Sequence, residues 1–220
     1  MDNPSKIMEG DKEYSLGEFD GKNVRYDFDK ILIYLNEKGK LLFGEKFKIY
    51  KDDESILIKL CNYFIRDKTN CDKYGIDPTK GILLSGPVGC GKTSLMKLLR
   101  HIVPLQRPYE VIPCRNVTFG FNHLGFKTVE DFGNSKLYCF DDLGVEPSGR
   151  FYGKDLNVMG EVLLSRYDLY LKSRKKIKTH ATTNLNAEEL EERYGNRVRS
   201  RMRELFNLIA FDEEAVDKRK

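Results

Sequence analysis

Hydrophobic residues follow two alternating patterns along most of this chain. Short continuous runs, among them Ile82–Leu84 and Leu137–Phe140, predict buried strands. Longer stretches between the runs repeat their apolar residues three and four positions apart, which predicts amphipathic helices. Strands that alternate with helices are typical of a parallel sheet covered by helices. The pattern therefore predicts an α/β sandwich with a five-stranded parallel sheet.

The individual strands and helices follow from the same pattern. The expected strands lie, in chain order, at 82–84, 111–114, 136–142, 178–184 and 207–211. Long helices are expected after Lys92, over 154–174 and from Ala187. The second strand should lie near a sheet edge because Pro113 has no N–H to donate. The aromatic and glycine-rich stretch 119–126 predicts a loop that either plugs the core or stacks on nucleic-acid bases. Its few cationic residues favour the plug.

The first fifty residues show a weaker pattern. Residues 1 to about 26 are polar and predict a loose arm. A helix is expected to begin at Asp27 and to end before Gly39, and a second one follows residues 52–54. Residues 66–80 form a polar linker to the first strand of the sheet. We therefore expect an N-terminal arm with one helix over residues 1–50, used for partner binding or packing, and the main domain over residues 51–220.

The composition favours a protein with an ordinary core, without a membrane span and with reduced cysteines. The 220 residues are enough for one domain with an ordinary core, and no apolar run approaches the length of a membrane span. The five cysteines show no C-x-x-C pairing, which fits reduced thiols in a cytosol. The net charge of +4 permits nucleic-acid contact without demanding it. We expect a cytoplasmic protein that does not bind membranes.

A glycine-rich turn between the first strand of the sheet and the next helix has the pattern G-x-x-x-x-G-K-[ST] of a P-loop, or Walker A motif. Its nucleotide-binding residues are expected to be Gly86, Pro87, Val88, Gly89, Cys90, Gly91, Lys92, Thr93 and Ser94. Glycines let backbone N–H groups turn toward phosphate oxygens, and the helix N-terminus adds partial positive charge. Lys92 is placed to reach the outer phosphates, and the Thr93 hydroxyl to ligate magnesium.

Two adjacent carboxylates end the strand at 136–142, about fifty residues after the P-loop. This is the Walker B pattern, although an acidic turn before Gly144 gives the same letters. Strand ends of a parallel sheet meet at the edge where ligands bind. Asp141 is then placed to hold the shell of a magnesium ion. Asp142 is placed to polarise the attacking water.

Two further motifs follow. Asn184 ends the fourth strand. Its amide is placed to orient the attacking water or to touch the terminal phosphate, or Asn184 is an ordinary turn residue. The stretch 197–203 carries four arginines on a helix whose buried stripe should be Val198, Met202 and Leu205. It is either a solvated basic helix or offers an arginine to the phosphates of a neighbouring subunit.

These four motifs in this order resemble the AAA+ ATPases of the DnaC/IstB type, which are bacterial replicative-helicase loaders and transposition helper ATPases. The resemblance covers roughly residues 75 to 215, so the main domain would be an AAA+ ATPase domain with strand order 5-1-4-3-2. It implies ATP and Mg²⁺ as cofactors. It also implies these roles: Walker A for Lys92 and Thr93, Walker B for Asp141 and Asp142, sensor one for Asn184, a trans-acting arginine finger for Arg201, and a supporting position for Arg197.

Departures from the family pattern change what we expect. Many AAA+ proteins carry glutamate where this chain has Asp142, and the shorter side chain predicts slow hydrolysis. The lid helices with a second-sensor arginine are expected to be absent after the last strand. Residues before 50 do not match the helicase-binding domain of the loaders, so the partner stays open between a replicative helicase and a transposase.

The working hypothesis is an ATP switch. Head-to-tail contact through Arg201 would build a homo-oligomeric ring or filament with ATP, because such contacts do not close as dimers. The assembly would load a replicative helicase onto single- or double-stranded DNA. The alternatives are a transposition helper ATPase of a mobile element, a P-loop small-molecule kinase, and a nucleotide-gated scaffold that barely hydrolyses ATP.

Overall fold

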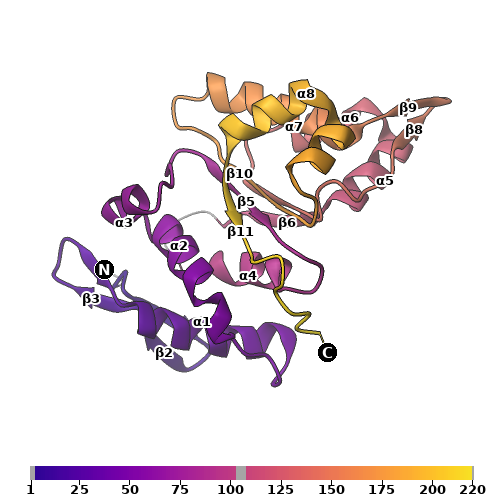
Figure 1. Cartoon of the computed structure of the whole chain (residues 1–220). Helices are drawn as coiled ribbons and strands as arrows, with labels where there is room; N and C mark the ends of the chain where they lie inside the picture. The colour runs from indigo at the N-terminus through magenta and orange to yellow at the C-terminus, as the bar shows by residue number, and fades with distance from the viewer. Residues whose placement is uncertain (1–2, 103–107, 220) are drawn as a thin grey trace. The chain divides into compact units, whose positions relative to one another are not determined.

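We describe the protein from a computed structural model, which describes residues 3–102 and 108–219 (Figure 1). Residues 1–2 of the expected arm, and residues 103–107 and 220 of the expected main domain, lie outside the described residues. Contacts divide the chain into two compact units, Thr79–Thr93 with Tyr109–Lys220 and Met1–Pro78 with Ser94–Pro108.

A single five-stranded sheet organises the first of these units. Its strands are β5 (Gly81–Ser85), β6 (Glu110–Pro113), β7 (Tyr138–Asp141), β10 (Thr179–Thr183) and β11 (Phe206–Ala210). All neighbours are parallel, and the order is β11-β5-β10-β7-β6. Numbered along the chain this is 5-1-4-3-2, so the predicted sheet and its order are confirmed. Strand β6 lies at the edge, where the missing N–H of Pro113 costs no ladder hydrogen bond.

One face of the sheet is covered by helices that the chain forms between the strands. They are α5 (Cys114–Leu124), α6 (Phe126–Phe132), α7 (Val158–Lys172) and α8 (Ala187–Leu205), seen above the sheet in Figure 1. Leu83 and Phe140 from the sheet share one buried cluster with Leu163 of α7 and Met202 of α8. Each such side chain contributes about 1.5–3 kcal/mol on burial, so this layer fixes where the strand ends meet.

Helix α8 forms as the sequence predicts. Asn186 caps it by accepting from the Glu189 backbone N–H at 3.0 Å, and the Glu189 carboxylate accepts from the Asn186 N–H at 2.7 Å. The expected stripe of Val198, Met202 and Leu205 is buried. The helix bends at Gly195, whose φ is 78°. The arginine-rich part therefore follows the bend.

Two predictions in this unit are wrong in detail. The loop expected over 119–126 is helical, because α5 continues to Leu124 and α6 begins at Phe126 after the single break at Gly125. Phe121 does plug the core, at 2 % exposed. The helix expected from residue 154 begins at Val158, since residues 149–156 form an antiparallel hairpin of β8 (Gly149–Phe151) and β9 (Lys154–Leu156).

Arg166 on α7 connects the amino-terminal ends of β7 and β10, which is the edge of the sheet away from the P-loop. Its guanidinium is fully buried and donates to Thr179 Oγ1 at 2.8 Å, to the Lys136 carbonyl at 2.9 Å and to the Lys178 carbonyl at 3.1 Å. Burial lowers its pKa to about 10. Every branch of the guanidinium has a partner, as a buried cation requires.

The second unit holds the elements before the sheet. They are β1 (Lys6–Glu9), β2 (Lys12–Ser15), β3 (Gly17–Phe19), β4 (Val24–Tyr26), α1 (Phe28–Phe43), the 3-10 turn η1 (Lys51–Asp53), α2 (Glu54–Ile65) and α3 (Lys68–Lys73). Helix α4 (Lys92–Leu99) belongs to this unit from Ser94 onward. Helix α2 was predicted. Helix α1 runs past its expected end to Phe43, and α3 lies within the expected linker.

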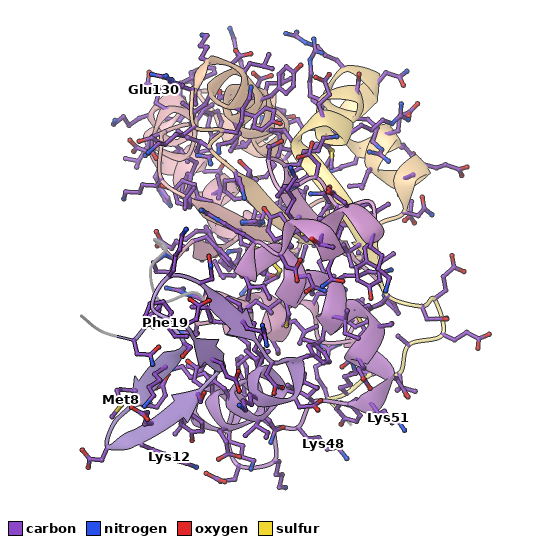
Figure 2. All side chains as sticks on the ribbon, turned by 90° about the vertical axis from the view of Figure 1, so that its left-hand side faces the viewer. Met8, Lys12, Phe19, Lys48, Lys51 and Glu130 are labelled. Carbon is purple, nitrogen blue, oxygen red and sulfur yellow. The ribbon has the colours of Figure 1, made fainter. Side chains whose placement is uncertain are left out.

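The loose arm predicted for residues 1–26 is wrong where the structure describes it. Strands β1 and β2 pair antiparallel, as do β3 and β4. The Glu9 carboxylate ties the first hairpin to α1 by accepting from Tyr34 OH at 2.8 Å and from Lys38 Nζ at 2.7 Å. Met8 and Phe19 are exposed on these hairpins (Figure 2). Short strands with polar and exposed side chains leave no apolar pattern, so the sequence did not reveal them.

A buried histidine joins β10 to β5. His180 is 4 % exposed, and its Nδ1 accepts from the Ile82 backbone N–H at 3.1 Å. The neutral ring therefore carries its proton on Nε2. Burial, followed by the nearby cations Lys178 and Arg166, lowers the pKa of His180 from 6.5 to about 3. The folded state binds this proton only in strong acid.

We expect the His180→Asn variant to lose part of the pH dependence of stability. Between pH 6.5 and about 3 the unfolded chain binds a proton at His180 that the folded chain does not, so stability falls as the pH falls. The slope from this group approaches about 1.4 kcal/mol per pH unit. Asparagine keeps an acceptor for Ile82 and does not titrate. Urea unfolding from pH 4 to 7 measures the difference; equal slopes in parent and variant would contradict the prediction. His123→Asn, at an exposed position, is the matched control.

Candidate nucleotide-binding site

The predicted P-loop connects β5 to α4. Lys92 is 6 % exposed, and its Nζ donates to the backbone carbonyls of Gly86 at 2.7 Å and of Pro87 at 2.8 Å. The loop is therefore wrapped around its own lysine. Gly89 has a φ of 85° and Gly91 a φ of 103°, a region in which residues with a Cβ are strained. These two glycines let the loop turn its N–H groups inward, which is the arrangement that binds anions.

The hydroxyl of Thr93, after the lysine of the predicted P-loop, contacts the carboxylate of Asp141, which the sequence predicts as Walker B. Thr93 Oγ1 donates to Asp141 Oδ1 at 2.8 Å, and Thr182 Oγ1 donates to the same oxygen at 2.7 Å. Asp141 is 7 % exposed. A hydroxyl oxygen and a carboxylate at this separation are ligands that Mg²⁺ prefers, together with phosphate oxygens and water. The donor set therefore fits a magnesium ion that Thr93 and Asp141 would hold.

Asp142 presents its carboxylate to solvent beside this pair. Its backbone is left-handed, with a φ of 56°, and its N–H donates to Thr182 Oγ1 at 2.9 Å. Desolvation and the neighbouring Asp141 carboxylate raise the pKa of Asp142, while the cations Lys92, Arg115 and Arg219 act in the opposite direction. A carboxylate with a raised pKa is suited to accept a proton from water. Sequence reasoning missed Thr182, which fixes both aspartates.

The turn after Asp142 is tied to α8. Glu146 is 4 % exposed; its carboxylate accepts from the Gly144 N–H at 2.8 Å and from Tyr194 OH at 2.7 Å. Burial raises the pKa of Tyr194, so its hydroxyl stays a donor. The backbone that carries the two aspartates is thus held between β10 and α8.

Asn184 lines a cavity of about 600 Å³ together with Gly86, Pro87, Arg199 and Arg203. Its Oδ1 is buried and, within the part of the chain that the structure describes, has no hydrogen-bond partner. Sequence reasoning did not assign roles to Arg199 and Arg203. The sequence feature that could have pointed to them is their spacing of four residues, which puts both on one flank of α8. Burial and the neighbouring Arg203 lower the pKa of Arg199.

Comparison with solved structures places this arrangement among known folds. The crystal structure of the DnaC helicase loader superposes with a TM-score of 0.52 at 19% identity, over 76% of this chain and 95% of that one. DnaA from Aquifex aeolicus, bound to AMPPCP, superposes with a TM-score of 0.51 at 18% identity, over 81% of this chain and 51% of that one. The fold is that of the AAA+ ATPases. This confirms the fold predicted from the motifs, and at these identities it shows the fold alone.

Sequence comparison gives a short match. The proteasome-activating nucleotidase of Pyrococcus abyssi is 59% identical over 32 residues, which is 14% of this chain and 8% of that protein. The same protein of Thermococcus onnurineus gives the same values. The match therefore spans less than a tenth of these relatives. No family model matches the sequence.

The arginines proposed for the AAA+ interface lie on the surface of α8. Arg201 Nη1 lies 3.4 Å from Glu204 Oε1 and 3.4 Å from the Tyr167 hydroxyl, and the guanidinium is 4.6 Å from the Tyr167 ring centre. Its side chain is 41% exposed. Arg197 is exposed as well. In the described residues Arg201 thus makes its contacts with α7 and α8, while Lys92, Thr93 and Asp141 are brought together at the sheet edge.

The length and hydrophobicity of the helices decide whether any of them could span a membrane. Among residues 3–102 and 108–219, no helix is both long and apolar enough to cross a membrane. The described residues after β11, numbers 211–219, contain no helix either. No lid helix therefore follows the last strand within the described chain.

Proposed function

We propose that this protein is an ATPase that binds Mg-ATP in the loop 86–94 and hydrolyses it slowly. The observation that carries the proposal is the hydrogen bond of 2.8 Å between Thr93 and Asp141, next to the buried Lys92. Three groups that phosphoryl chemistry needs, a cation and two oxygen ligands for a metal, meet there at the end of a glycine-rich turn. The AAA+ fold and the nucleotide-bound DnaA neighbour support this.

Each side chain has one task in this mechanism. Lys92 would exchange the two loop carbonyls for phosphate oxygens. Thr93 and Asp141 would hold Mg²⁺, which when bound neutralises phosphate charge. Asp142 would take the proton of the attacking water, and Asn184 would orient that water through its amide. Among the residues that the structure describes, none is a hydrogen-bond partner of Asn184 Oδ1, which leaves an acceptor available for this task.

Assembly is the second part of the proposal. The Arg201 side chain is 41% exposed, and within the described residues it is held to its own chain by a contact with the Tyr167 ring and by hydrogen bonds to Tyr167 and Glu204, each worth about 1 kcal/mol or less. It can therefore swing to the nucleotide of a neighbouring subunit at small cost. Head-to-tail contact would give a ring or filament. We propose that this assembly loads a replicative helicase onto DNA, which the likeness to the DnaC helicase loader supports.

The proposal is tested by ATP titration, by measuring the mass of the assembly, and by capturing candidate partner proteins. We expect the parent to bind Mg-ATP in calorimetry and to grow in mass with a non-hydrolysable ATP analogue. Immobilised parent should then retain a purified replicative helicase. Retention of a transposase instead would favour the transposition helper. Phosphoryl transfer to a metabolite by a monomer would favour the kinase, and absence of heat on ATP titration would reject the proposal.

We expect Asp142→Asn to lower ATP turnover about 100-fold while leaving ATP affinity and assembly intact. The amide cannot take the proton, but asparagine tolerates the left-handed backbone at this position, so the fold is kept. In the parent, turnover should fall as the pH drops through the raised pKa of Asp142, because the protonated carboxyl cannot act as a base. A phosphate-release assay measures both effects. Equal turnover in parent and variant would favour the nucleotide-gated scaffold.

A further inference from the structure

The chain returns to the P-loop after the last strand. The Phe211 N–H donates to the Ser85 carbonyl at 2.8 Å, which continues the pairing of β11 with β5. The Phe211 side chain packs against Gly86, where an added Cβ would lie 2.6 Å from the Phe211 Cβ. Residues 212–219 follow, and we call them the tail. The tail therefore starts beside the first glycine of the P-loop.

Lys218 contacts the P-loop with both its backbone N–H and its side-chain Nζ. Its backbone N–H donates to the Gly89 carbonyl at 3.1 Å, and its Nζ donates to the Cys90 carbonyl at 2.6 Å. The same Nζ lies 5.1 Å from the ring centre of Phe211. Lys218 itself is half-buried. Two neighbouring carbonyls of the P-loop are thus fixed by one residue 128 positions away from Cys90 in the chain.

Asp217 shows how closely the tail approaches. A Cβ placed on Gly89 would lie 2.1 Å from Asp217 Oδ1, so only glycine permits this contact. The Asp217 carboxylate is held in turn by Arg219, whose backbone N–H and Nε donate to Oδ1 at 3.0 Å and 3.1 Å. The tail is therefore an ordered turn against the loop.

The effect of Lys218 on nucleotide binding depends on whether it contacts the carbonyls or the N–H groups of the P-loop. A P-loop binds phosphate with its N–H groups. The Gly86 and Pro87 carbonyls accept from Lys92, whereas the Gly89 and Cys90 carbonyls accept from Lys218. The C=O and N–H of one trans peptide point in opposite directions. Donation by Lys218 to the carbonyls of Gly89 and Cys90 therefore favours a loop whose following N–H groups face the other side. We propose that Lys218 is a positioning residue of the nucleotide site, which holds the P-loop in its binding conformation; this rests on the proposed function.

Nucleotide affinity of the full-length chain tests this assignment. We expect Lys218→Met to weaken binding of a fluorescent Mg-ADP analogue about tenfold, because a charge-assisted hydrogen bond that fixes the loop is lost while the packing of the side-chain stem is kept. Lys218→Arg should stay within about threefold of the parent, since it restores the cation and its donors. Lys175→Met, at an exposed lysine, should bind like the parent.

Hydrogen exchange without nucleotide supplies a second measurement. The amides of residues 88–91 should exchange faster in Lys218→Met than in the parent, at an unchanged melting temperature. Unchanged exchange, or binding as tight as or tighter than the parent, would overturn the assignment; tighter binding would mean that the tail competes with nucleotide. A parent that binds no nucleotide would instead reject the proposed function, and the exchange measurement would still decide whether Lys218 holds the loop.

Discussion

Replacing Lys92 by alanine should weaken Mg-ATP binding at least about 100-fold. The lysine follows the glycine turn that is expected to bind the phosphates, and its Nζ already donates to two loop carbonyls at 2.7 and 2.8 Å. Two charge-assisted hydrogen bonds to phosphate oxygens would be lost, at about 1.5–3 kcal/mol each. Calorimetric titration with Mg-ATP measures the loss.

The control for this variant lies one turn further along the same helix. Lys97 on α4 is exposed, so Lys97→Ala should bind ATP like the parent. Thermal unfolding checks that Lys92→Ala is folded. Folded Lys92→Ala with the affinity of the parent would show that the triphosphate does not bind at this loop, and the mechanism proposed above would fail.

Replacing Arg201 by alanine should lower ATP turnover about 1,000-fold or more and leave ATP affinity of the monomer unchanged. An arginine that reaches transition-state charge from a second subunit contributes on this scale. The folded chain should tolerate the loss, because the Arg201 side chain is 41% exposed and its hydrogen bond to Glu204 is exposed to solvent. Phosphate release at high protein concentration measures turnover, and Arg174→Ala, at an exposed position, is the matched control.

A mixing experiment separates action between subunits from action within one. Arg201→Ala has an intact hydrolytic site and lacks the finger, while Asp142→Asn has the finger and lacks the base. If the finger acts on a neighbour, the mixture should regain turnover that neither variant has alone. A mixture as inactive as its components would contradict assembly through Arg201, even if ATP binding is intact.

The sequence alone predicted the parts that depend on neighbours along the chain. The run Ile82–Leu84, the glycine turn and Lys92 are consecutive, so strand, loop and helix follow from local patterns. Pro113 predicted the edge strand for a local reason, its missing N–H. Of the two aspartates predicted as Walker B, Asp141 ends strand β7 of the parallel sheet and Asp142 follows it. The structure places Thr93 in hydrogen-bond contact with Asp141. Their roles with ATP and the roles of Arg201 and Arg197 stay predictions.

Tertiary structure alone decided which distant residues complete the site. Thr182 fixes both aspartates because β10 lies between β5 and β7, a pairing that leaves no periodic signal in the sequence. Lys218 reaches the P-loop because β11 lies beside β5. The hairpins of residues 6–26 likewise depend on backbone pairing and on the distant partners of Glu9. Apolar periodicity and motif spacing encode local conformation, whereas polar contacts between remote segments depend on strand order and side-chain geometry.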